Sequence, residues 1–268
     1  MKNTRNQHFV LFFALITGFL ISCSKNGSNN DGPYQLSYGD SILYLKSSGG
    51  DYIVYPTSHR SGTYTGFPDG IEIDDLTGAI NVSKSETGLR YRITHTATDG
   101  TMTTTKVVLS GITFTDHYYH LSTGDSVAFP VYNANTLRIL PVNGSSFDEG
   151  NTANGGGCSV KTTNGQINLA ETVRNGVFGS TPQNDVRRDF DIEYRLNDES
   201  GKSLNKLRVR LYYYETMADV PPDLLETLQD REDLGVFLRN NTSSAFNETS
   251  RIEKEARPRP PCVIVIGQ

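Results

Sequence analysis

The sequence predicts an all-β protein of two tandem antiparallel β-sandwiches, followed by a short helical extension and a final strand. Three kinds of observation predict this class: an internal repeat, apolar residues that alternate with polar ones, and turns rich in Asp, Asn and Gly. The expected segments are a signal peptide over 1–22, a tether over 23–33, repeats over 34–116 and 117–218, and a tail over 219–268.

The amino-terminal segment has the composition of a secretory signal. Lys2 and Arg5 precede an apolar run over residues 9–21. That run is shorter than the roughly 20 apolar residues that span a bilayer, so we expect an exported chain whose signal is removed. The sequence Leu20-Ile21-Ser22-Cys23 resembles the lipobox of bacterial lipoproteins. The resemblance implies that Cys23 is acylated and becomes the first residue of the mature chain.

The stretch over residues 24–32 contains no apolar side chain. Such a composition buries too little surface to offset the entropy of ordering, so we expect a tether between the lipid and the folded part. Ser, Lys and Asn follow Cys23, rather than the acidic run that sends some lipoproteins to the cell exterior. We therefore expect a protein bound through its lipid to the bacterial outer membrane, on the periplasmic side.

Charge and cysteine content exclude several functions. The chain has 25 basic and 30 acidic residues without a dense cationic cluster, which argues against a nucleic-acid partner. Its Cys and His residues lack the close spacing of a zinc site, and we expect no metal and no cofactor. Besides Cys23 the chain contains Cys158 and Cys262, and an oxidising compartment permits a disulfide between them. Two separate buried thiols are equally compatible with the sequence.

The folded part is duplicated. Blocks of similar sequence recur in the same order, which makes two repeats the simplest interpretation. The matching blocks are 39–42 with 124–127, 52–56 with 137–141, 77–82 with 164–169, 91–95 with 190–194, and 106–109 with 206–209.

Alternation with a period of two predicts strands that have one face on a core. Apolar residues alternate with polar ones along residues 91–97 and again along residues 190–196. Residues 98–100 and 197–201 are turn sequences, and a second alternating run follows each of them. Each repeat is therefore expected to contain a hairpin. Because helical periodicity is absent over 34–214, we expect antiparallel sandwiches.

The tail departs from this pattern. Pro221-Pro222 precedes leucines at helical spacing, which predicts a helix that begins at proline. Residues 262–266 form an unbroken apolar run that is too short to span a bilayer. A loose strand of this kind would aggregate, so we expect it to complete a sheet, either in the second repeat or in a partner.

A family resemblance supports the sandwich interpretation. Residues 71–80, which read Ile-Glu-Ile-Asp-Asp-Leu-Thr-Gly-Ala-Ile, and residues 91–100, which end in Ala-Thr-Asp-Gly, are similar to the signature of cadherin-like and immunoglobulin-like domains of bacterial surface proteins. The resemblance implies cadherin-like or immunoglobulin-like sandwiches. It also raises calcium binding between domains, but the acidic motifs are largely replaced at 83–86 and 116–120, so we expect no calcium site.

The sequence does not predict an enzyme. Ser41 and Ser126 each follow Gly-Asp and resemble the nucleophile of a hydrolase family, but that family's later histidine block is missing from the chain. The doubled occurrence favours a structural turn that leads into a strand. The same Asp-Ser-aliphatic tripeptides also match an O-glycosylation sequon of some Gram-negative bacteria.

Two features point to binding. The chain has no tryptophan, but other rings could form a platform for sugars, namely Tyr52, Tyr55, Tyr64, Phe67, Tyr212, Tyr213 and Tyr214. Val177-Phe178, between glycines in a long loop of the second repeat, is either a binding loop or packs on its own domain.

From these features we expect a lipid-anchored, non-enzymatic protein of the cell envelope that acts in adhesion or in structural protein interaction through sheet edges and loops. The alternative is a glycan-binding accessory lipoprotein of a carbohydrate-uptake system.

Overall fold

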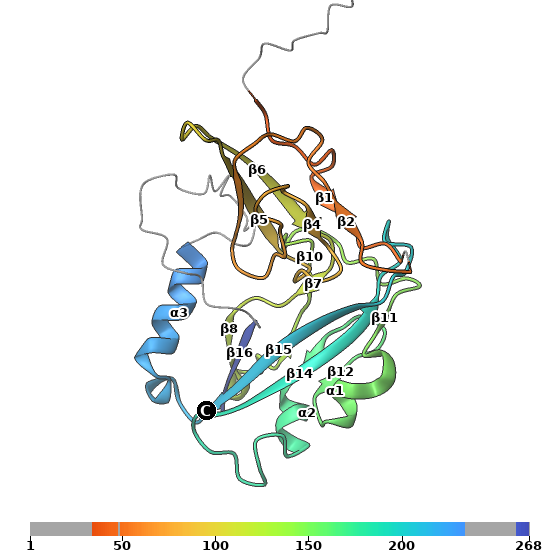
Figure 1. The fold of residues 1–268 in the computed structure, drawn as a ribbon. Coiled ribbons are helices and arrows are strands. Elements are labelled where there is room, and N and C mark those ends of the chain that lie inside the picture. The colour runs from red at the N-terminus through yellow and green to blue at the C-terminus, as the bar shows by residue number, and fades with distance from the viewer. Residues whose placement is uncertain (1–33, 48, 234–260, 268) are drawn as a thin grey trace, which may run out of the picture. The chain divides into compact units, whose positions relative to one another are not determined.

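The hairpin of each repeat forms the centre of a sheet (Figure 1). The computed structural model describes residues 34–47, 49–233 and 261–267, and those from Gln35 on belong to one compact unit. The fold is mostly β with several sheets, which confirms the β-rich character that the sequence predicts, while the sandwich arrangement stays a prediction. That each repeat is a separate domain stays a prediction. None of the helices in the described ranges is long and apolar enough to cross a membrane.

The first repeat is built on a four-stranded sheet in the order β1-β6-β5-β3. Its strands are β1 (Ile42–Leu43), β2 (Ile53–Val54), β3 (Thr63–Phe67), β4 (Ile80–Asn81), β5 (Arg90–Thr96), β6 (Met102–Leu109) and β7 (Ile112–Thr113). Strands β5 and β6 pair antiparallel, so the predicted hairpin is confirmed. Tyr91, Ile93 and His95 are buried on one face of β5, as the alternation predicts.

The second repeat is built on a five-stranded sheet in the order β11-β14-β15-β16-β8. Its elements are β8 (His117–His120), β9 (Val127–Ala128), β10 (Val131–Tyr132), β11 (Ser146–Phe147), α1 (Thr152–Gly155), β12 (Ser159–Val160), β13 (Ile167–Asn168), α2 (Leu169–Arg174), β14 (Val186–Arg195) and β15 (Asn205–Tyr214). The tail contributes α3 (Pro222–Asp233) and β16 (Cys262–Ile266). The predicted second hairpin, the helix that begins at proline and the final strand are all confirmed.

Equivalent hydrogen bonds confirm the internal repeat. In each repeat a hydroxyl group donates to the carbonyl of the asparagine that ends a strand and accepts a backbone N–H from a third segment. The bonds are Ser85 Oγ to Asn81 O (2.7 Å) and Glu72 N to Ser85 Oγ (2.9 Å), and then Thr172 Oγ1 to Asn168 O (2.8 Å) and Ser159 N to Thr172 Oγ1 (2.9 Å). The same sequence separation relates all three pairs of residues, so the blocks 77–82 and 164–169 correspond in space.

Two matched pairs of blocks are wrong. Block 39–42 ends in β1, whereas block 124–127, to which it was matched, ends in β9, the counterpart of β2. Strand β2 pairs with β4 through Ile53 and Val54, and the strand that pairs with β13 in the same way is β9. Block 52–56 therefore corresponds to the region of β9, whereas block 137–141 lies in a loop between β10 and β11. The two blocks share an apolar run before proline, but that pattern does not distinguish an edge strand from an apolar loop.

Two further expectations need correction. The sheets are not purely antiparallel, because β1 pairs parallel with β6, and β16 pairs parallel with both β15 and β8. The second repeat also contains the short helices α1 and α2. Helix α2 begins where the Asn168 side chain accepts a hydrogen bond from Glu171 N at 2.9 Å, and this N-cap satisfies a backbone donor of the first turn.

The five-stranded sheet has an apolar cluster on each face. The larger cluster contains Val263 and Val265 of β16 with residues from β14, β15 and the helices α1 and α2. The smaller one contains Ile264 and Ile266 of β16 with Leu228 of α3. Strand β16 is thus buried on both faces, as its unbroken apolar sequence requires.

A buried polar network joins the two repeats. The Tyr194 hydroxyl of β14 accepts the Ile112 N–H at 3.1 Å and lies 3.0 Å from Thr87 Oγ1. Ser110 Oγ donates to Asp198 Oδ2 at 3.2 Å, again from the first repeat to the second. Burial raises the pKa of Tyr194 to about 12, so this hydroxyl stays protonated at neutral pH.

Replacing Tyr194 by phenylalanine is expected to lower the free energy of unfolding by about 1–3 kcal/mol, because the Ile112 N–H loses its partner inside the protein. Urea unfolding followed by circular dichroism measures this loss. The same substitution at Tyr55, whose side chain is exposed, is the control and should change the midpoint little. Equal midpoints for the two variants would contradict a stabilising role for this hydroxyl.

Candidate functional site: an apolar loop and a charged strand face

The structure separates the two cysteines proposed as a disulfide. Cys158 lies in the larger cluster, whereas Cys262 lies in the smaller cluster on the other face of the sheet. Both are buried thiols, which is the alternative that the sequence left open. Burial raises the pKa of Cys158 to about 12, so this thiol is not a reactive thiolate. Cys23, the predicted site of lipid attachment, lies outside the described residues.

The loop that contains Val177 and Phe178 packs on its own repeat. Phe178 is 2% exposed and its ring centroid lies 5.5 Å from that of Tyr213. Val177 is partly buried against the same cluster. The binding-loop interpretation is therefore wrong for this tip, and the alternative interpretation holds.

Most rings of the candidate sugar platform are also in the core. The buried ones are Tyr64, Tyr212, Tyr213 and Tyr214. Tyr55 is 61% exposed, while Tyr52 and Phe67 are half-buried. This set does not form a continuous exposed row of rings, which a sugar would need for stacking.

The residues considered for catalysis and calcium binding have structural contacts. Ser41 and Ser126 contribute backbone carbonyls that accept hydrogen bonds from Val108 N and Leu169 N, each at 2.8 Å. Asp116, at the position of the interdomain calcium motif, accepts the Cys262 N–H at 2.6 Å. Across the described ranges, no group of three or more His, Cys, Asp or Glu side chains is arranged to hold a metal.

The structure reveals a different loop whose backbone is held by hydrogen bonds. Leu137 N donates to Asn135 Oδ1 at 2.9 Å, and Val142 N donates to Leu140 O at 2.9 Å. Beyond it, Asn197 Nδ2 donates to Asn143 O at 3.0 Å, which ties the loop to the turn between β14 and β15. We name residues 135–142 the apolar loop.

Apolar side chains of this loop face solvent. Ile139 is 89% exposed and Leu137 is 65% exposed, while Leu140 between them packs against the larger cluster. Leu140 and the hydrogen bonds hold the loop, so its exposed side chains are presented from a fixed backbone. Sequence analysis missed this feature because it matched residues 137–141 to block 52–56 of the first repeat, although Asn135 and Asn143-Gly144 on either side are turn residues.

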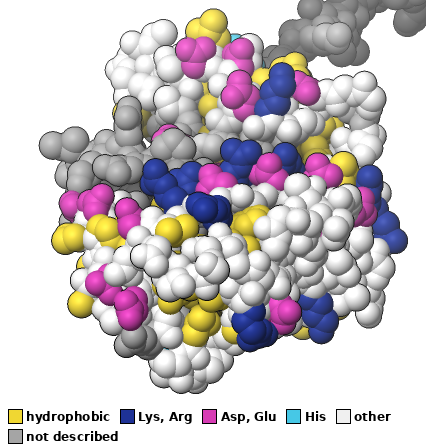
Figure 2. Space-filling model, turned by 90° about the horizontal axis from the view of Figure 1, so that it is seen from below, with side chains coloured by type: hydrophobic (Ala, Val, Ile, Leu, Met, Phe, Trp, Pro, Cys, Tyr) yellow, Lys and Arg dark blue, Asp and Glu magenta, His cyan; other side chains and the backbone are white. Residues whose placement is uncertain are grey.

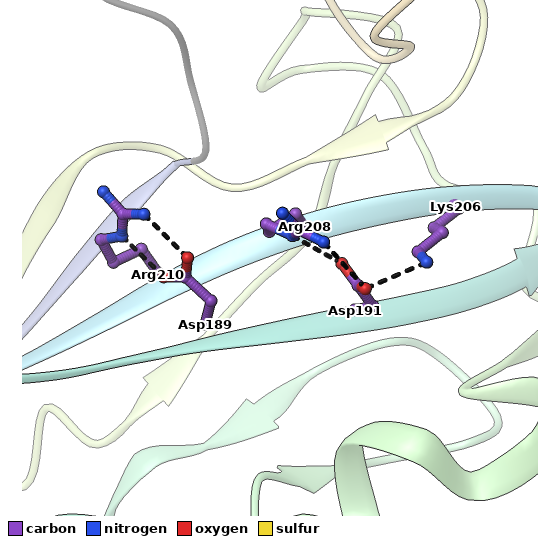
Figure 3. Close-up of polar contacts among 5 residues, drawn as sticks. All are labelled: Asp189, Asp191, Lys206, Arg208 and Arg210. Carbon is purple, nitrogen blue, oxygen red and sulfur yellow. Dashed lines mark hydrogen bonds and ion pairs between the residues drawn. The ribbon is translucent and has the colours of Figure 1, made fainter. Parts of the chain in front are cut away.

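A second surface feature is a ladder of ion pairs on the β14–β15 hairpin (Figure 3). Asp189 accepts two hydrogen bonds from Arg210, Nε to Oδ1 at 2.6 Å and Nη2 to Oδ2 at 2.7 Å. Asp191 binds Arg208, Nε to Oδ1 at 2.8 Å, and Lys206, Nζ to Oδ2 at 3.0 Å. We name these five residues the charged strand face. On the side of the molecule seen in Figure 2, basic and acidic side chains alternate in a row.

The acidic and basic side chains of the charged strand face pair with one another. Hydrogen bonds from Arg210 lower the pKa of Asp189, and those from Arg208 lower the pKa of Asp191. Pairs as exposed as these contribute at most about 1 kcal/mol each, because solvent screens them. The face offers a ligand little unpaired charge. We therefore interpret the charged strand face as a surface that keeps the hairpin soluble. The apolar loop is the stronger candidate for binding.

Comparisons with known proteins show only weak structural likeness. No family model matches the chain, and no curated protein matches its sequence. Among solved structures, the chain is similar to Drosophila N-cadherin EC1-4, with 13% sequence identity and a TM-score of 0.20. The match covers 66% of this chain and 48% of the cadherin chain, so this chain spans about half the length of that structure. At this score the likeness is weak, and no functional argument rests on it.

Proposed function

We propose that the protein is a lipid-anchored, non-enzymatic component of the bacterial cell envelope that binds a protein partner through the apolar loop. The observation that carries the proposal is the exposure of Leu137 and Ile139 on a loop whose backbone is fixed. Exposed apolar side chains of this size lose contact with water when a partner covers them, and each fully buried one contributes about 1.5–3 kcal/mol. A fixed backbone adds to the affinity, because little ordering entropy is lost on binding.

A protein partner fits this loop better than a glycan does. Sugars bind through stacked rings and polar groups, whereas Leu137 and Ile139 are aliphatic. Most of the candidate rings elsewhere in the chain are buried. Adhesion or structural interaction is therefore our first proposal, and glycan capture is an alternative that the experiment below also tests.

The membrane part of the proposal rests on the sequence. Acylation of Cys23 would fix the chain to the outer membrane, and the residues after it favour the periplasmic side. In that arrangement the protein meets envelope partners that are confined to the same surface, so a modest affinity is sufficient for association.

The experiment compares two variants of the chain that starts at residue 24. Wild type, Leu137→Ser with Ile139→Ser, and the control Leu76→Ser are immobilised and exposed to solubilised envelope proteins. Leu76 is also exposed, at 68%, but lies in the first repeat. We expect the loop variant to lose at least tenfold in affinity for the retained protein, and the control to bind as wild type does.

All three proteins should unfold at the same temperature, because only exposed side chains change. A glycan array is read with the same samples. If the variant with Leu137→Ser and Ile139→Ser binds the retained protein as tightly as wild type does, the proposal that the apolar loop binds a protein partner is wrong. Glycan binding that survives the loop substitutions would favour the alternative function.

A further inference from the structure

The final strand, β16, lies beside the hairpin of the second repeat, in the position that β1 occupies beside the hairpin of the first repeat. In the first repeat, β1 pairs parallel with β6 and the Ser41 carbonyl accepts the Val108 N–H at 2.8 Å. In the second repeat, β16 pairs parallel with β15 and the Pro261 carbonyl accepts the Arg210 N–H at 3.0 Å. Since the hairpins β5–β6 and β14–β15 correspond, β16 is the spatial equivalent of β1.

The sequential equivalent of β1 is a different strand. Strand β1 precedes β2 along the chain, and β8 precedes β9, the counterpart of β2, in the same way. By this correspondence β8 would pair directly with β15. In the structure β8 pairs instead with the far edge of β16, from Val263–His117 to Ile266–His120. The terminal strand is thus inserted between the first strand of the repeat and its hairpin (Figure 1).

The rest of the fold provides a complete site for this strand. The edges of β15 and β8 supply backbone partners on both sides. The larger cluster surrounds Val263 and Val265, while Tyr212, Tyr214 and helix α3 surround the side chains on the other face. The Asp116 carboxylate accepts the first N–H of the strand. None of these partners belongs to β16 or to the residues next to it in the chain.

We propose that the place between β15 and β8 is a strand-acceptor site, and that β16 of a second copy of this chain fills it in a strand-exchanged dimer. Helix α3 ends at Asp233 and β16 begins at Cys262. A connection of that length reaches at most about 90 Å when extended, far enough to reach a neighbouring molecule. The structure shows the chain's own β16 in this site, and an identical strand from a second copy meets the same requirement for a parallel strand with apolar residues on both faces.

Exchange of β16 between two copies loses few of the contacts that the strand makes in the monomer. A closed dimer in which both copies exchange β16 keeps every backbone pair and every apolar contact of the monomer. The balance between the two forms then depends on concentration, because exchange joins two copies of the chain. This inference uses a surface distinct from the apolar loop and does not depend on the proposed function.

A disulfide trap tests the exchange. Arg210 and Cys262 are register partners and their side chains lie on the same face of the sheet, so Arg210→Cys should bond Cys262 on oxidation. One full-length copy, the acceptor, carries Arg210→Cys with Cys262→Ser. The other, the donor, keeps Arg210 and Cys262. Both carry Cys158→Ala and different epitope tags within residues 24–33, and they are expressed together.

We expect a disulfide-linked heterodimer that carries both tags and disappears on reduction. The matched control acceptor has Arg208→Cys instead, on the same strand but before the first residue of β15 that pairs with β16. It should give at least tenfold less heterodimer. A single copy with Arg210→Cys and native Cys262 should form the bond internally, which checks the register and the fold of the variant.

Two results would overturn the proposal. An internal bond without any heterodimer would mean that β16 stays in its own chain. Failure of the internal bond as well would mean that β16 does not lie beside β15 in this register.

Discussion

Replacing Ile264 by aspartate is expected to destabilise the protein by about 4–7 kcal/mol. The Ile264 side chain is 0% exposed and lies at the centre of β16 among the apolar residues of the smaller cluster. The substitution removes about 1.5–3 kcal/mol of apolar burial and places a carboxylate where it has to be desolvated. A loss of this size approaches the whole stability of many domains.

The matched control for this prediction is Ile139→Asp, the same chemical change at an exposed residue of the apolar loop. It should shift the free energy of unfolding by less than about 0.5 kcal/mol. Urea unfolding monitored by circular dichroism compares the two variants with wild type. If Ile264→Asp unfolds at the urea concentration of the control, β16 contributes nothing to the sheet.

The second large effect is expected at a glycine whose α-hydrogen faces an aromatic ring. Gly165 has φ +72°, and a Cβ placed there would lie 2.7 Å from Cδ1 of Phe147, a buried core residue. Gly165→Ala therefore combines about 1–2 kcal/mol of backbone strain with about 1–3 kcal/mol of ring displacement. We expect a total loss of about 2–5 kcal/mol, measured as a lowered midpoint of thermal or urea unfolding.

A second glycine isolates the contribution of the ring. Gly176 has φ +76°, and a Cβ there would meet nothing within 4 Å. Gly176→Ala should therefore show the backbone strain alone, about 1–2 kcal/mol. Equal losses for the two variants would mean that Phe147 moves aside without cost. The first repeat has the same arrangement, with Gly78 at φ +71° and a Cβ position 2.6 Å from Cδ1 of Tyr64.

The parts of the fold that the sequence predicted are those set by local pattern. The hairpins were predictable because alternation along residues 91–97 and 190–196 continues for the length of a strand. Strands as short as β2 and β9 carry too few residues to show a period. For that reason the block 52–56 was matched to an apolar loop rather than to the region of β9.

The parts that the sequence did not predict depend on distant contacts. Parallel pairing of β16 with β15 joins segments that are separated by a helix and by residues 234–260, and no local signal specifies it. The binding candidates show the same limit. Phe178 and Ile139 are both apolar residues in loops, yet Phe178 contacts Tyr213 in the core whereas Ile139 meets solvent. Only the packing of the whole repeat distinguishes them.

The position of β16 also determines when the five-stranded sheet can become complete. Its residues follow every other strand of that sheet along the chain, yet they lie in the interior of the sheet rather than at its edge. Until they are in place, β15 and β8 have no partner between them, although every residue of the β14–β15 hairpin is already present. This strand therefore serves as a test of completeness: a product that stops short of Cys262 keeps exposed strand edges, which folding and degradation machinery can recognise.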